Sequence, residues 1–220
     1  MLPQGVIRMF QNKKTRIAMD NPIIKSPVMF YTEVTPNPET MKFVTNRILY
    51  RGTADFRERE LAETWSPLSK MLFELPYVKG VYICNNFVTV TKEFNYDWRE
   101  ITLLLKEKIK SFVEEGGTVL QEGFAEAMAA LEPREAISGS GDDAELSKRI
   151  KDLIDTYVKP AVEGDGGNIE FKSFYQGTVT VILQGSCSGC PSSTVTLKSG
   201  IEGMLRRMIP EVQEVVSEME

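Results

Sequence analysis

A segment rich in proline, glycine and serine divides this chain and limits how it can fold. The stretch EPREAISGSGDDAE contains Pro133, a Ser-Gly-Ser-Gly run and then acidic residues. Such a composition favours a flexible, solvated linker over a packed element. We therefore expect a disordered leader at residues 1–27, a flexible linker at 131–144, and two small domains at 28–130 and 145–220.

The front domain, residues 28–130, carries patterns typical of both strands and helices. Asn85-Asn86 separates two β-branched and aromatic runs and tolerates the positive φ of a tight turn. Asp97 is placed to cap a helix that Gly116 can end. One apolar helix stripe comprises Trp98, Ile101, Leu105, Ile109 and Phe112. The expected elements are strands at 28–34 and 40–46, a helix at 67–75, a hairpin at 78–93 and a helix at 98–116. They predict an α+β sandwich.

The back domain, residues 145–220, predicts the order α-β-β-α with a short strand to close. Pro160 should kink or end the first helix, and Gln176-Gly177 should turn a hairpin. The expected elements are a helix at 144–163, strands at 168–175 and 178–185, a helix at 192–208 and a strand at 212–219. The first helix face comprises Leu146, Ile150, Leu153, Ile154, Tyr157 and Val158. The second comprises Leu197, Ile201, Met204, Leu205 and Met208.

Two cysteines, Cys187 and Cys190, lie between the second strand and the second helix of the back domain. Pro191 suits the first helical turn, where its missing N–H is harmless. Unpaired N–H groups and the helix dipole should then face both sulfurs and lower their pKa values. On a helix, Cβ atoms at this spacing lie about 5–6 Å apart. The pair therefore suits two ligands of one metal centre, or a reversible disulfide.

Three chemistries fit such a pair. A thiol-disulfide oxidoreductase also uses strand, CxxC and helix, but too few residues follow the motif to complete a thioredoxin fold. A structural zinc site and an iron–sulfur cluster both require four ligands, whereas one chain offers two here and contains no histidine. Two chains could each contribute a pair at a symmetric interface. A cluster held in that way would be exposed and easily exchanged, which suits a delivery vehicle.

The residues around this motif resemble a known family. The run QGSCSGCPSSTVTLKSGIEGMLRRMIPEV, with VEGDGGNIEF upstream, resembles the C-terminal, Nfu domain of NifU. TEVTPNPETMKFV and VYICNNFVTVTKEF resemble the N-terminal domain of Nfu proteins, so the similarity covers residues 28–220. The resemblance implies a carrier that shares a [4Fe–4S] cluster between two subunits. It implies Cys187 and Cys190 as the ligands, an upstream assembly scaffold as donor, and apo iron–sulfur proteins as acceptors.

Other functional classes find little support. A net charge of −5 argues against nucleic-acid binding, and no apolar run approaches the roughly 20 residues of a membrane span. The sequence shows no P-loop and no catalytic carboxylate pair, so we expect no enzymatic activity. Cys84 reads as an inert, half-buried cysteine, and Asp165 as a helix cap rather than a metal ligand.

The compartment is less constrained by the sequence. Residues 1–27 are basic and poor in acids, as mitochondrial targeting peptides are, but they are short of Ser and Arg. We therefore expect a bacterial cytoplasmic protein, with the mitochondrial matrix as the alternative.

Overall fold

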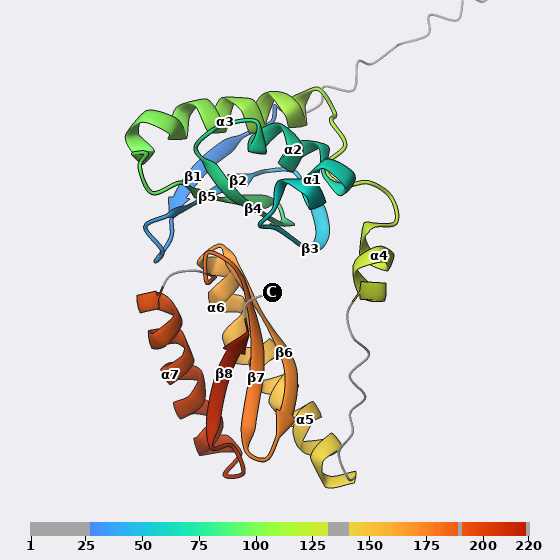
Figure 1. Ribbon diagram of the computed structural model, residues 1–220, viewed down its shortest axis with the longest axis vertical. Helices are drawn as coiled ribbons and strands as arrows, with labels where there is room; N and C mark the ends of the chain where they lie inside the picture. Colours follow the sequence, from blue (N-terminus) through green and yellow to red (C-terminus); the bar gives the residue numbers. More distant parts are fainter. Residues whose placement is uncertain (1–26, 132–140, 189–190, 219–220) are drawn as a thin grey trace, which may run out of the picture.

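The computed structural model describes residues 27–131, 141–188 and 191–218, which form two α+β domains (Figure 1). The front domain holds a five-stranded antiparallel sheet in the order β1-β2-β5-β4-β3. Its strands are β1 Phe30–Val34, β2 Thr40–Thr45, β3 Tyr50–Phe56, β4 Val78–Asn85 and β5 Phe87–Lys92. Its helices are α1 Arg59–Trp65, α2 Pro67–Phe73, α3 Trp98–Glu114 and α4 Phe124–Leu131.

The two faces of the front sheet are buried in different ways. One face packs under α1, α2 and α3 and forms the main core, to which α3 contributes Ile101, Leu105 and Ile109. Successive side chains of a strand point to opposite faces, so β4 sends Tyr82 and Cys84 to the other side. There a small apolar cluster is buried, comprising Val44, Tyr82, Cys84 and Phe87. In Figure 1 the back domain lies on this second side.

The back domain pairs a three-stranded sheet with helices. Strands β6 and β7 form an antiparallel hairpin, and β8 joins β7 in parallel. The strands are β6 Gly167–Tyr175, β7 Thr178–Gly185 and β8 Glu214–Glu218. The helices are α5 Gly141–Leu153, a π-helical turn at Ile154–Val158, α6 Lys159–Gly164 and α7 Pro191–Met208. Ile154, Ile169 and Leu205 are fully buried in a core separate from that of the front domain.

Most predicted elements are confirmed. Asp97 caps α3 by accepting from the Arg99 N–H at 2.8 Å, and Asn85 adopts φ 47° at the β4–β5 turn. Gln176 and Gly177 both have positive φ between β6 and β7, as the hairpin requires. The sequence missed β3, α1 and α4, and α5 begins at Gly141, within the segment assigned to the linker. The rest of that linker, 132–140, and leader residues 1–26 lie outside the described residues.

Two positions of the predicted apolar faces are wrong. Tyr157 is 62% exposed because the π-helical turn widens the helix just before Pro160 and rotates this side chain outward. Met208 is 44% exposed at the last turn of α7, and Ile209 beyond it is buried instead. The regular α-helix is interrupted just before Pro160, as the sequence predicts, but the chain stays helical in α6 as far as Gly164. Among the described helices, none is long and apolar enough to cross a membrane.

Candidate metal centre

Cys187 lies in a tight loop between the end of β7 and the start of α7, as the sequence predicts. Its side chain is buried, with an exposed fraction of 9% for the residue. Gly185 ends β7 with φ +62°, a left-handed conformation that glycine adopts easily. Cys190 lies outside the described residues, so the placement of the second predicted ligand stays a prediction.

Hydrogen bonds tie the Cys187 loop to the turn between α6 and β6. The Ser186 N–H donates to the Gly166 carbonyl at 3.2 Å, and the Ser186 hydroxyl donates to the Asp165 carbonyl at 2.7 Å. The Ser188 hydroxyl donates to the Gly185 carbonyl at 2.9 Å. Neighbouring residues on both sides of Cys187 are thus fixed, which limits where its sulfur can lie.

The glycines of the GDGG motif have separate roles. Gly166 has φ +82°, a left-handed conformation that glycine adopts easily. Gly167 is different, because it lies in β6 without a positive φ. A Cβ added there would come within 2.9 Å of Cys187 Sγ and 2.8 Å of the Gln184 carbonyl oxygen. Gly167 is therefore needed for space beside the thiol, rather than for its backbone angles.

Cys187 lines a hollow of about 410 Å³ at the end of the back domain. The hollow is bounded by Pro36 of the front domain and by Val162, Asp165, Ser186, Thr196 and Leu197 of the back domain. Asp165 forms the C-terminal cap of α6 through its N–H, which donates to the Ala161 carbonyl, and this agrees with the predicted capping role. The hollow gives a metal or cluster room beside the sulfur.

The predicted low thiol pKa is wrong for Cys187. Burial raises the pKa of this thiol, the Ser186 hydroxyl lowers it in part, and the negative charge of Asp165 raises it further. The helix-dipole effect fades within the first turn. Cys187 precedes Pro191, the first residue of α7, by four residues, so its thiol gains little from the helix dipole.

Cys84 is a buried core residue of the front sheet and not part of the Cys187 loop. It is 1% exposed in β4, accepts from the Asn85 side chain at 3.4 Å, and has a pKa raised mainly by burial. It is even more deeply buried than the sequence predicts, and it belongs to the apolar face of the front sheet. Among the residues that the structure describes, no group of three or more Cys, Asp or Glu side chains could hold a metal ion.

Asn37 is a site residue that the sequence did not reveal. It lies in the turn between β1 and β2, is 3% exposed, and reaches across to the back domain. Its Nδ2 donates to the Ser186 carbonyl at 3.1 Å and approaches the Ser188 carbonyl at 3.4 Å. These carbonyls flank Cys187. Because the turn reads simply as a proline-rich connection, only tertiary structure could identify this contact.

Two family models match the chain. A model described as a NifU-like domain matches residues 150–216. A model described as the N-terminal domain of scaffold protein Nfu/NifU matches residues 30–116. One match falls within each of the two domains of the structure.

Several known proteins are similar over most of this chain. The "NFU1 iron-sulfur cluster scaffold homolog, mitochondrial" of Drosophila persimilis is 38% identical, covering 91% of this chain and 68% of that protein. The human protein of the same name is 36% identical, covering 92% and 80% respectively. That of Drosophila grimshawi is 40% identical, covering 84% of this chain and 59% of its own length. A solved NifU-like protein from Saccharomyces cerevisiae aligns with 56% of this chain and 99% of its own, with TM-score 0.40 and 18% identity.

Proposed function

Because the chain belongs to the Nfu family of NifU-like iron–sulfur cluster scaffolds, we propose that it binds a [4Fe–4S] cluster as cargo and transfers it to apo-proteins. Cys187 and Cys190 are the proposed ligands. The observation that carries the proposal is Cys187 itself, a thiol held on a fixed loop beside a hollow of about 410 Å³. Gly167 leaves the space that this sulfur occupies.

The ligand count supports a cluster shared by two chains. A [4Fe–4S] cluster takes four cysteine thiolates, and the CxxC motif supplies two. The other cysteine, Cys84, is buried in the front sheet. Two copies of the Cys187 loop would complete the set at a symmetric interface.

The surroundings of Cys187 favour delivery over permanent storage. Burial raises the pKa of the Cys187 thiol and the charge of Asp165 raises it further, so both disfavour the free thiolate. When an acceptor thiolate replaces Cys187 on the iron, the sulfur can take up a proton and return to its neutral state. We infer that release proceeds by such ligand exchange, one thiolate at a time, without enzymatic turnover.

Anaerobic reconstitution with iron and sulfide tests the proposal. We expect a brown protein with about four irons per pair of chains, and a doubling of mass by light scattering on loading. Cys187→Ala and Cys190→Ala should abolish the colour, whereas Cys84→Ala should retain it. A brown sample that stays a single chain with its full iron content would contradict the shared site.

The same samples separate the rival chemistries. A dimeric structural zinc protein would be colourless and hold about one zinc per two chains. A thiol-disulfide oxidoreductase would reduce insulin-type disulfides in its metal-free form. Either result would replace the carrier proposal.

The names of the similar proteins support a proposal for the partners and the compartment. We propose an upstream assembly scaffold as cluster donor and apo iron–sulfur proteins as acceptors. The similar proteins are named as mitochondrial, which supports the mitochondrial matrix over the bacterial cytoplasm that the leader composition favours. Location of the tagged full chain in fractionated source cells would decide between the two compartments.

A further inference from the structure

The front domain contacts the loop that carries Cys187. Asn37 donates from one amide group to the carbonyls on either side of this cysteine, at 3.1 and 3.4 Å. Its own Oδ1 accepts from the Glu39 N–H at 2.9 Å, which fixes the orientation of the amide. Pro36, the preceding residue, lines the same hollow as Cys187. One turn of the front domain therefore both holds the loop and narrows access to its hollow.

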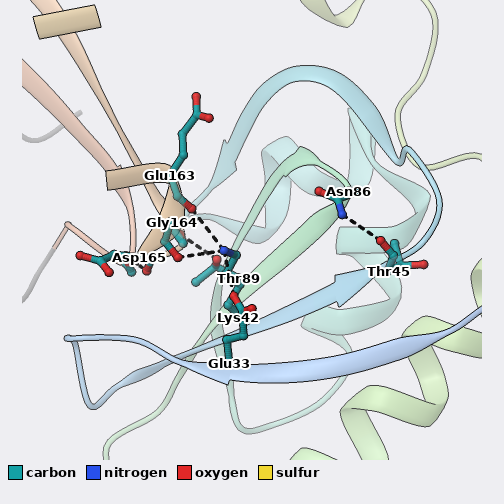
Figure 2. Close-up of polar contacts among 10 residues, drawn as sticks. Glu33, Lys42, Thr45, Asn86, Thr89, Glu163, Gly164 and Asp165 are labelled. Atoms are coloured by element: carbon teal, nitrogen blue, oxygen red, sulfur yellow. Dashed lines mark hydrogen bonds and ion pairs between the residues drawn. The ribbon is translucent and has the colours of Figure 1, made fainter. Parts of the chain in front are cut away.

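Two further side chains of the front domain hold the turn beside the loop. Lys42 donates to the carbonyls of Glu163 at 3.3 Å and Gly164 at 2.9 Å, at the C-terminal end of α6 (Figure 2). A cation is favourable there, because the last carbonyls of a helix carry partial negative charge. The Thr89 hydroxyl donates to the Gly166 carbonyl at 2.7 Å, and Figure 2 shows Thr89 and Lys42 side by side.

Apolar contact accompanies these hydrogen bonds. A Cβ added to Gly185 would come within 2.7 Å of the Tyr82 ring, so this ring packs directly on the backbone at the end of β7. Tyr82 is 1% exposed and Phe87 5% exposed, although both point away from the helices of the front domain. Without the back domain, this face of the sheet would present a bare apolar patch to water.

The polar contacts share one property. In the contacts of Asn37, Lys42 and Thr89, the front domain donates from side chains, and the back domain accepts through main-chain carbonyls. Positions of main-chain carbonyls depend on the conformation of the loop and turn. The front domain therefore recognises how these segments are folded, and a change in the Cys187 loop would break its contacts.

We propose that the front domain is a cap on the Cys187 loop, tied to it by Asn37, and that it separates from the loop when two chains share a cluster. The step that requires separation rests on the proposed function. In the capped form Cys187 is 9% exposed behind the Pro36–Asn37 turn, which leaves little of this residue for a second chain to contact. Because linkage is reciprocal, anything that weakens the cap also favours loading.

Two buried cysteines report on the cap in the metal-free chain. Cys187 lies on the back-domain side, whereas Cys84 belongs to the front-sheet face that the back domain covers. Separation of the domains should expose both thiols together. A local change in the loop should expose Cys187 alone. Their alkylation by iodoacetamide can be followed by mass spectrometry in full-length Cys190→Ser protein, in which Cys187 is the only thiol of its tryptic peptide.

Asn37→Asp is the decisive variant, since it keeps the acceptor for Glu39 and places a carboxylate against two carbonyls. We expect both cysteines to react at least about tenfold faster than in the parent, because two hydrogen bonds are lost. Asn46→Asp is the matched control. Asn46 makes the same kind of amide contacts, to the Pro27 carbonyl and the Met29 N–H, but within the front domain. It should leave both rates within about twofold of the parent.

Thr89→Val guards against misfolding, because it changes only the hydroxyl that donates to Gly166. We expect about a fivefold increase at both cysteines, with circular dichroism and the unfolding midpoint retained. Unchanged rates in both variants would overturn the cap. Faster alkylation of Cys187 alone would also overturn it, because Asn37 would then be only a local support of the loop. The same would hold if Asn46→Asp raised both alkylation rates as much as Asn37→Asp.

The loaded chain provides a separate arm. Reconstitution of the wild-type protein with iron and sulfide should raise the alkylation rate of Cys84, because the cap has left its face. Cys84 that stays protected in a fully loaded dimer would overturn the separation step. A chain that binds no cluster would contradict the proposed function, while the rates of the metal-free variants would still decide whether the cap exists.

Discussion

At the scale of single residues, the proposed cluster site depends on the absence of a side chain at Gly167. Gly167 faces Cys187 so closely that even a methyl group would come within 2.9 Å of the sulfur and 2.8 Å of the Gln184 carbonyl. The carbonyl is part of the β6–β7 hairpin and cannot move aside cheaply. The loop position of the thiol is therefore set by the backbone across from it.

Gly167→Ala should displace the Cys187 loop and destabilise the back domain by about 1–3 kcal/mol, the usual cost of overpacking. Iron retained after reconstitution should fall in parallel. Gly203→Ala is the matched control, because nothing lies within 4 Å of a Cβ at this helical position. It should stabilise α7 by about 0.5–1 kcal/mol. Urea unfolding of both variants measures the difference, and equal stabilities would refute the role of Gly167.

The sequence alone identifies some residues around the Cys187 loop as candidates and misses others. Cys187 is identified by its motif, because two thiols between a strand and a helix have few uses. Asn37 is not, since its partners are 149 and 151 residues away in the chain and are main-chain carbonyls without a sequence signal. The direction of the Cys187 pKa was also missed, because burial depends on packing that no local pattern encodes.

At the scale of elements, the first helix of the back domain shows how packing modifies a periodic pattern. Ile150, Ile154, Val158 and Val162 repeat every four residues and are all buried. In a regular α-helix each such step overshoots a full turn by about 40°, so the stripe would drift around the helix. The wider π-helical turn at Ile154–Val158 takes up this excess and keeps the stripe on one face. Tyr157 is turned to solvent as a consequence.

This account predicts opposite outcomes for two neighbouring positions. Ile154→Ala should cost about 2–5 kcal/mol, because it leaves a cavity in the core of the back domain. Tyr157→Ser should change the free energy of unfolding by less than about 0.5 kcal/mol, as expected for an exposed side chain. Chemical denaturation of the full chain provides both values. A large cost at Tyr157 would mean that its ring has a partner in solution.

Elements with strong apolar periods were predictable, and those fixed by the neighbouring structure were not. Strands β4 and β5 and helix α3 carry continuous or periodic apolar residues, and their bounds follow closely from the sequence. Strand β3 contains Arg51, Gly52 and Asp55, which weaken any strand pattern, and it is held by pairing with β4. Helix α1 fully buries only Ala62, with Leu61 and Trp65 partly buried against the core, so its apolar stripe is too short to give a clear helical period.

At the scale of the whole molecule, each domain has its own hydrophobic core, and the two domains contact each other through a separate, smaller surface. The back domain buries its own apolar set, from Ile150 to Val215, without residues of the front domain. The cluster of Tyr82, Cys84, Phe87 and Val44 depends on the contact between domains, and so does part of the burial of Cys187 beside Pro36. The back domain should therefore fold by itself, whereas the front domain alone would carry an uncovered apolar patch.

Removal of residues 1–130 tests this division directly. The remaining chain should bind the same iron per pair of chains, since both proposed ligands and the whole second core are retained. It should also take up the cluster faster than the full chain, because no cap has to leave Cys187.

The truncated chain should transfer its cluster poorly to some apo-proteins if the front domain selects partners. Recovery of acceptor activity measures this transfer, and the same truncation with Cys187→Ala gives the background. Equal transfer to every acceptor would show that the front domain plays no part in selection, and slower loading would contradict its action as a cap.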